Sequence, residues 1–86
     1  MAADTVAVNG YAVRALRHAR HMKQQTLAVA AELSPSYLSE IESSAKVNVS
    51  RDVLGRLMDA LFLRPEDERA LTRWWTVAEL AGEVAA

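Results

Sequence analysis

The sequence predicts a small all-α domain built from five helices. Strand signals are nearly absent, because β-branched residues are scattered and no alternation of apolar and polar residues persists. Apolar residues recur instead at helical spacing in several segments, and each of the two prolines stands where a helix can begin. A chain of 86 residues has room for one such domain and no more.

The first two helices are expected over about residues 10–22 and 24–32. Asn9 is the N-cap that we expect for the first helix, since its side chain can accept from the first free N–H groups. The second helix is short, and its apolar residues are mostly small, so it can lie close to a neighbour. The apolar positions are Ala12, Val13, Leu16 and Ala19 in the first helix and Leu27, Ala28 and Ala31 in the second.

The third and fourth helices have the clearest start signals. Ser34 is expected to cap a helix that has Pro35 at its first position and ends near Glu42 and Ser43. Residues 44–49 are interpreted as a loop, after which Ser50 opens the fourth helix. The apolar residues of the third helix are Tyr37, Leu38 and Ile41, and those of the fourth are Val53, Leu54, Leu57, Met58, Ala60 and Leu61.

The fifth helix is expected to begin at Pro65 and to reach Gly82 or beyond. Acidic residues follow Pro65 directly and would complement the helix dipole. Apolar residues lie on more than one side of this helix, and a domain of this size cannot cover them all. We therefore expect an isologous homodimer, with one tryptophan in the subunit's own core. The expected interface residues are Trp74, Trp75, Leu80 and Val84.

Charge divides the chain into two parts. A net charge of -1 does not by itself suggest a nucleic-acid binder. Residues 1–64, however, carry eight basic and six acidic groups, whereas residues 65–86 carry two basic and five acidic groups. The N-terminal part can therefore face phosphate while the acidic C-terminal part serves another purpose.

Residues 24–42 have the pattern of two short helices joined by about three residues, which is the helix-turn-helix unit. The steep crossing of the helices needs a small residue at the contact, and Ala28 supplies it. Leu38 and Ile41 of the second helix are expected to pack against Ala28. The residues that flank this contact are Leu27, Ala31 and Leu33.

This segment, QQTLAVAAELSPSYLSEIE, resembles the helix-turn-helix of the lambda-repressor-like family, also called the Cro or xenobiotic-response-element family. The similarity extends to VRALRHAR at residues 13–20 and to the fourth helix. The resemblance implies a DNA-binding domain over residues 10–63, after a flexible arm at residues 1–9 and before a C-terminal helix at residues 64–86 of the same domain. Where the family often has glycine, this chain has Glu32 and Ser44, and a positive φ there would cost on the order of 1 kcal/mol.

The resemblance implies that the third helix reads bases in the major groove and that its surroundings hold phosphates. Serine hydroxyls and a glutamate can contact base edges, although the helix lacks the Arg, Lys, Asn and Gln that discriminate strongly. The expected base contacts are Pro35, Ser36, Ser39 and Glu40. The expected phosphate contacts are Lys23, Gln24, Gln25, Ser34, Tyr37, Lys46, Arg20 and Arg51. For any one of these, ordinary surface solvation remains the alternative, and for Tyr37 the alternative is packing.

The resemblance also implies a partly buried ion pair between Arg17 and Glu42, which some family members have at the corresponding positions. A glutamate so close to DNA is tolerable when a partner neutralises its charge. Arg17 would then serve the architecture of the domain and not the DNA.

The expected function is a double-stranded DNA-binding transcriptional regulator acting as a dimer on a palindromic operator. A phage Cro or immunity repressor and a small bacterial repressor both fit. The alternative is a protein-binding module or an antitoxin that acts through the C-terminal helix. We expect no enzyme, because the sequence has no glycine-rich phosphate loop, no nucleophile motif and no carboxylate pair in an identifiable pocket. We expect no metal, because cysteine is absent and His18 and His21 have no partners at metal-ligand spacing. We expect no cofactor either. The expected location is the cytoplasm and nucleoid of a bacterial or phage-infected cell, since no membrane span or signal peptide is recognisable.

Overall fold

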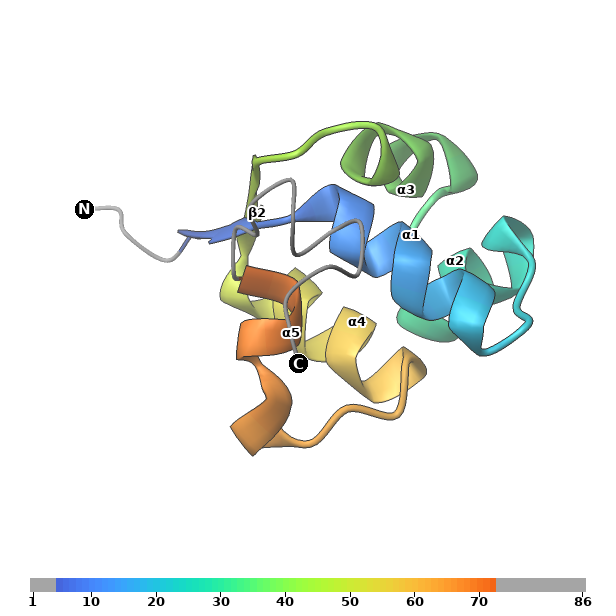
Figure 1. The fold of residues 1–86 in the computed structure, drawn as a ribbon. Coiled ribbons are helices and arrows are strands. Elements are labelled where there is room, and N and C mark those ends of the chain that lie inside the picture. Colours follow the sequence, from blue (N-terminus) through green and yellow to red (C-terminus); the bar gives the residue numbers. More distant parts are fainter. Residues whose placement is uncertain (1–4, 73–86) are drawn as a thin grey trace, which may run out of the picture.

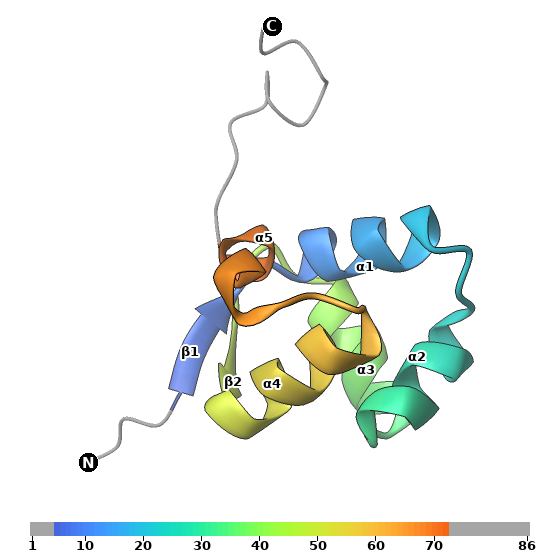
Figure 2. The same ribbon diagram turned by 90° about the horizontal axis from the view of Figure 1, so that it is seen from below.

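The computed structural model describes residues 5–72, and it is mostly helical, with a small two-stranded sheet (Figures 1 and 2). The elements in order are β1 (Thr5–Val8), α1 (Gly10–Ala19), α2 (Gln24–Ala31), α3 (Pro35–Glu42), β2 (Val47–Ser50), α4 (Arg51–Ala60), the 3-10 helix η1 (Pro65–Asp67) and α5 (Arg69–Thr72). The all-α class with five helices is confirmed.

Three helix starts are fixed by the side chains that the sequence predicted. The Asn9 side chain accepts from the first backbone N–H groups of α1, at 3.0 and 3.3 Å. Ser34 Oγ accepts from the Tyr37 N–H, and Ser50 Oγ accepts from the Val53 N–H. Each cap satisfies a donor that has no partner within its helix, so these starts could be predicted from local sequence.

The core lies between the four longer helices. In Figure 1, α3 lies at the top and α4 at the bottom, with α1 between them. α2 packs against both α3 and α4, and α1 packs against α3. The largest fully buried side chains come from the five α-helices, from both strands and from the residue after α4: Leu27, Leu38, Ile41, Leu57, Leu61, Leu71, Val8, Val13 and Val49.

The small sheet is the main departure from the sequence interpretation. Residues 5–8, assigned to a flexible arm, pair antiparallel with residues 47–50, most of which were assigned to a loop. In the register Val6 opposes Val49 and Val8 opposes Val47, which brings the valines of both strands to one face. Four residues are too few for an alternating pattern to be recognised before the partner strand is known.

The strand β1 is also connected to the C-terminal end of the described chain. The backbone N–H of Asn9 donates to the Leu71 carbonyl at 2.6 Å. Leu71 is fully buried in the common core. The segment before α1 is therefore held by β2 on one side and by α5 at its end.

Several helix ends also differ from expectation. α1 ends at Ala19 and not near Met22, and the predicted fifth helix begins as η1 before α5 starts at Arg69. Three residues after helix ends adopt left-handed backbone conformations, namely His21, Glu32 and Phe62, with φ of 54°, 59° and 61°. Of the two positions where the family often has glycine, Glu32 has a positive φ and Ser44 does not. The expected cost of a positive φ therefore applies to Glu32 and not to Ser44.

Gly10 allows the start of α1 to lie close against the end of α3. A Cβ at this position would lie 1.7 Å from the Ile41 carbonyl oxygen and 2.5 Å from the Ser44 carbonyl oxygen. Both obstacles are backbone atoms at the end of α3, so neither can move aside without shifting that helix. The absence of a side chain at Gly10 therefore sets how α3 lies against α1.

The substitution Gly10→Ala should lower the free energy of unfolding by at least about 2 kcal/mol, because the methyl group forces the α3 backbone away. Gly55→Ala is the matched control, since a Cβ there meets nothing within 4 Å and alanine favours helix by about 1 kcal/mol. Urea unfolding at submicromolar protein concentration measures both. Equal stability of Gly10→Ala and wild type would contradict the close approach.

Candidate nucleic-acid interface

The α2–α3 pair presents one face of α3 to solvent. Ala28 and Ala31 of α2 and Leu38 and Ile41 of α3 are buried, which leaves the opposite side of α3 uncovered. The structure places all four expected base contacts on that side as exposed residues: Pro35, Ser36, Ser39 and Glu40. It thus brings together, on one helix face, the residues that the sequence singled out.

A buried ion pair holds the far end of α3. Arg17 Nε donates to Glu42 Oε2 at 2.8 Å, and Arg17 Nη2 donates to Glu42 Oε1 at 3.0 Å. Glu42 is only 3% exposed and Arg17 only 8%. Two parallel hydrogen bonds between a guanidinium and a carboxylate fix both distance and orientation, so this pair sets the position of α3 relative to α1.

Two further contacts complete this cluster. Arg17 Nη1 donates to the Met22 carbonyl at 2.9 Å, and Gln24 Nε2 donates to Glu42 Oε1 at 3.0 Å. The carboxylate thereby gains a third donor, and the connection between α1 and α2 is held in place. Such additional hydrogen bonds are what makes a buried charge pair tolerable.

Gln24 has a structural partner that the sequence did not suggest. It was expected to contact a phosphate through its backbone N–H and its side chain, and one donor of its side-chain amide is used by Glu42. The backbone at the start of α2 keeps its capacity for anions, because the N-cap residue Lys23 makes no side-chain capping bond. The N–H groups of a helix's first turn have no partners within the helix and point outward along its dipole.

A polar groove lies beside the exposed face of α3. Arg17 and Glu42 line it together with five other residues: Tyr11, Arg14, Gln24, Ser39 and Ser43. Tyr11 was not considered from the sequence, and Arg14 was only one of several basic residues there. Their three-residue spacing with Arg17 on α1 is the signal that could have placed them on one ridge facing α3.

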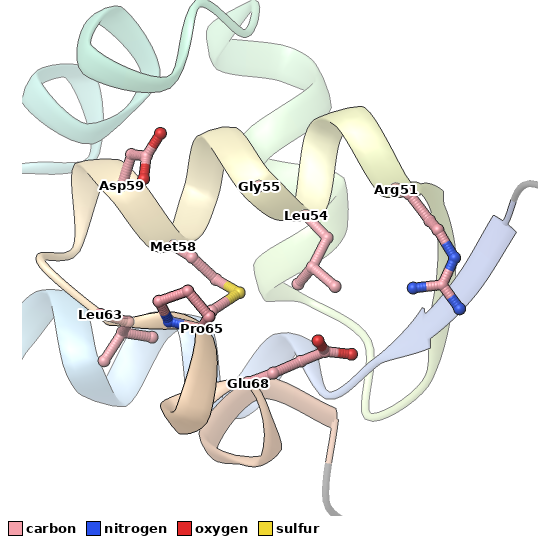
Figure 3. Close-up of a pocket in the computed structure, with 8 residues that line it drawn as sticks. All are labelled: Arg51, Leu54, Gly55, Met58, Asp59, Leu63, Pro65 and Glu68. Carbon is pink, nitrogen blue, oxygen red and sulfur yellow. The ribbon is translucent and has the colours of Figure 1, made fainter.

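The other expected phosphate contacts are dispersed. Arg20 caps the end of α1 and donates to the Leu16 carbonyl at 3.5 Å, and Ser34 is used as the cap of α3. Tyr37 is partly buried against the core, whereas Gln25 and Lys46 are exposed. Arg51 lines a groove between α4 and η1 (Figure 3), so the structure does not bring it together with the residues around α3.

Arg56 has a structural role that the sequence did not reveal. Its Nη1 donates to the carbonyls of Ala31 and Glu32, at 3.3 and 2.9 Å, at the end of α2. Its Nη2 also pairs with Asp52 one turn earlier, at 3.0 Å. A cation at a helix C-terminus is favourable, and here it supports Glu32 in its left-handed conformation. The one signal in the sequence was the four-residue spacing of Asp52 and Arg56, which allows an ion pair that holds the Arg56 side chain.

Two other features are absent from the part of the chain that the structure describes. Residues 5–72 contain no group of three or more His, Cys, Asp or Glu side chains arranged to hold a metal ion. Within the same range, no helix combines the length and the apolar character needed to cross a bilayer.

Comparison with known proteins agrees with this geometry. The family model of the helix-turn-helix domain matches residues 10–72. The restriction-modification controller protein C.AhdI from Aeromonas hydrophila is 34% identical, with a TM-score of 0.61 over 69% of this chain and 88% of that protein. The clp gene regulator ClgR from C. glutamicum is 33% identical, with a TM-score of 0.60 over 88% of this chain and 87% of its own. No curated protein matches the sequence.

Removal of either partner of the buried ion pair should be strongly destabilising, since it leaves the other charge buried without compensation. We expect Arg17→Ala and Glu42→Ala each to cost about 3–5 kcal/mol, with a coupling energy above about 1 kcal/mol in a double-mutant cycle. The exposed pair Arg64–Glu66, at 3.4 Å, is the control and should couple by less than about 0.5 kcal/mol. Additive effects of the two alanine substitutions would refute the assignment.

Proposed function

We propose that this chain, which belongs to the lambda-repressor-like helix-turn-helix domains, is a transcriptional regulator that binds double-stranded DNA through α3. One observation carries the proposal. The exposed polar face of α3 is held by the buried Arg17–Glu42 pair directly beside the uncapped start of α2. A helix that fits the major groove thus lies next to backbone donors that suit a phosphate.

The phosphate contacts that we propose surround α3. Lys23 and the N–H groups of Gln24 and Gln25 lie at the start of α2, and Arg14 and Tyr11 line the polar groove. Lys46 lies between the end of α3 and β2. These groups would fix the register of the domain on DNA without reading its sequence.

The base contacts that we propose are those of the exposed α3 face. Ser36 and Ser39 can donate to or accept from several bases, Glu40 can accept from a cytosine amino group, and Pro35 can contact a thymine methyl. Such a helix discriminates modestly between base pairs. Sequence-dependent DNA shape and the spacing of two half-sites would supply the remaining specificity.

The more specific hypothesis is a repressor of the phage Cro or immunity type, or a small bacterial repressor. We propose that it is located in the cytoplasm with the nucleoid and has no enzymatic activity. It would act as a homodimer on a palindromic operator, which brings two α3 helices about 34 Å apart. The expected interface residues Trp74, Trp75, Leu80 and Val84 lie outside the described residues. The two structural relatives, whose names describe a controller and a gene regulator, support the regulator itself.

A protein-binding module is the second candidate, and one observation favours it. The sequence of α3, PSYLSEIE, has none of the Arg, Lys, Asn or Gln side chains that make strong bidentate base contacts. Electrophoretic mobility shifts with DNA from around the protein's own gene, over a salt series, separate the two candidates. Specific retardation supports the regulator, and no retardation at any salt concentration supports the protein-binding module.

The affinity for DNA should fall steeply with salt. If each subunit neutralises four phosphates, the slope of log K against log salt is about -3.6 per subunit, and Lys23→Ala should flatten it by about 1. Glu40→Ala should instead change base preference and leave the slope unchanged. Fluorescence anisotropy with a labelled duplex measures both quantities. A binding constant indifferent to salt would be incompatible with the proposed phosphate contacts.

Self-association should depend on the C-terminal tryptophans. Trp75→Ala should raise the dimer dissociation constant at least about tenfold if this side chain anchors the interface. Analytical ultracentrifugation of the full chain at micromolar concentration provides the measurement, and Trp74→Ala shows which tryptophan belongs to the subunit's own core through its effect on unfolding. A wild-type monomer at this concentration would argue against the proposed dimer.

A further inference from the structure

The turn between α2 and α3 depends on one residue in an unfavourable backbone conformation. Glu32 follows α2 with a φ of 59° and a ψ of 43°, which lie in the left-handed region. Residues with a Cβ are disfavoured there, whereas glycine is not. Two residues, Leu33 and Ser34, separate Glu32 from the first residue of α3. The backbone angles of Glu32 therefore set the direction in which the chain enters α3.

The carbonyl groups at the end of α2 show what holds this conformation. The last carbonyls of a helix have no partners within the helix. Two of them accept from backbone N–H groups of the turn itself, at 2.9 and 3.1 Å. The carbonyls of Ala31 and Glu32 accept instead from Arg56 Nη1, at 3.3 and 2.9 Å. One side chain of α4 thus binds the backbone on both sides of the peptide bond that leads into the left-handed residue.

The Arg56 side chain is itself fixed by its contacts. Its Nη2 pairs with Asp52, one turn earlier on α4, at 3.0 Å. Its Nε is buried and has no hydrogen-bond partner within residues 5–72. A buried donor without an acceptor is unfavourable, so the observed conformation depends on what the two terminal nitrogens bind. Because α4 packs against α2 (Figure 2), the guanidinium ties the turn to a helix that lies outside the proposed DNA interface.

The helix α3 is therefore held at both of its ends. The buried Arg17–Glu42 pair holds the last residue of α3, which is about 10 Å along the helix from its first residue. The turn at Glu32 holds the start of α3. A helix fixed at one end can still tilt about that point, so the second attachment is what sets its tilt.

We propose that Arg56 is a positioning residue for DNA recognition. It offsets the cost of the left-handed Glu32 backbone, fixes the tilt of α3, and so places the start of the helix, with Pro35 and Ser36, in the major groove. Arg56 contributes no phosphate contact. The inference rests on the proposed function as far as DNA binding is concerned, whereas the coupling between Arg56 and Glu32 is a property of the free protein.

The substitution Arg56→Met removes the donors and keeps an unbranched side chain. The cost of the left-handed residue is then unopposed, and it corresponds to a factor of about 5 to 30 in population, so the Kd for DNA should rise by about that factor. The slope of log K against log salt should stay unchanged, because no phosphate contact is lost. Fluorescence anisotropy of the full chain, with duplex from around the protein's own gene, measures both at a temperature where each variant is folded.

Arg64→Met is the matched control for the loss of charge. Arg64 pairs with Glu66 and Asp67 on η1, and its removal should change the Kd by less than about twofold. An equal loss of affinity in both variants would show that Arg56 acts through its charge and would overturn the proposal.

A second substitution at Glu32 tests how Arg56 acts. Glycine adopts the left-handed conformation without strain, so Glu32→Gly should restore the Kd of Arg56→Met to within about threefold of the wild type. Glu32→Ala removes the same carboxylate but keeps the Cβ, and it should not restore the affinity. A role of Arg56 in overall stability alone predicts no change of Kd in folded protein. An unchanged Kd in Arg56→Met, no rescue by glycine, or equal rescue by alanine would each overturn the proposal.

Amide hydrogen exchange separates this inference from the proposed function. The Leu33 N–H bonds the Ala28 carbonyl across the turn, and the Ser43 N–H bonds the Ser39 carbonyl at the far end of α3. In free Arg56→Met, exchange at Leu33 should speed up at least about fivefold relative to exchange at Ser43. A wild type that binds no duplex would contradict the proposed function and with it the role in recognition, while faster exchange at Leu33 would still support the attachment of the turn by Arg56. Equal changes at Leu33 and Ser43 would contradict that attachment.

Discussion

The buried pair between Arg17 and Glu42 is the constraint on which the rest of the structure depends. Glu42 ends α3, Arg17 lies on α1, and the same guanidinium holds the Met22 carbonyl before α2. One cluster therefore fixes three helices relative to one another. Because burial of an unpaired charge is so unfavourable, α3 has essentially one position in which Glu42 is satisfied. The fixed position of α3 follows from this pair.

The same cluster explains how a chain with a net charge of -1 can present a surface suited to phosphate. Glu42 lies close to the proposed DNA interface, but its charge is neutralised by Arg17 and screened by Gln24. In the proposed interface the positive charge available to DNA is therefore small, and backbone N–H groups at the start of α2 would supply part of the attraction. The excess of acidic residues lies in another part of the chain, from Pro65 onward. The net charge of -1 is therefore the sum over two parts of opposite net charge.

Features that depend on a few consecutive residues could be predicted from the sequence, and features that depend on distant partners could not. The caps Asn9, Ser34 and Ser50 act within three residues, so the starts of α1, α3 and α4 were evident. The two strands form only because residues 5–8 pair with residues 47–50, which are distant in the sequence. Gln24 likewise bonds Glu42, 18 residues away, and Arg56 reaches the end of α2 from α4. The groove between α4 and η1 is likewise lined by residues up to 17 positions apart, from Arg51 to Glu68, which no local pattern reveals.

Amide hydrogen exchange of the full chain, with and without a bound duplex, tests the central claim most directly, because it reports on every segment at once. If α3 is the DNA-reading helix, binding should slow exchange in the first turn of α2 and in residues 35–46, with little change in residues 51–68 at a concentration that keeps the protein from self-associating. Protection confined to residues 51–68, with α3 unchanged, would contradict the account.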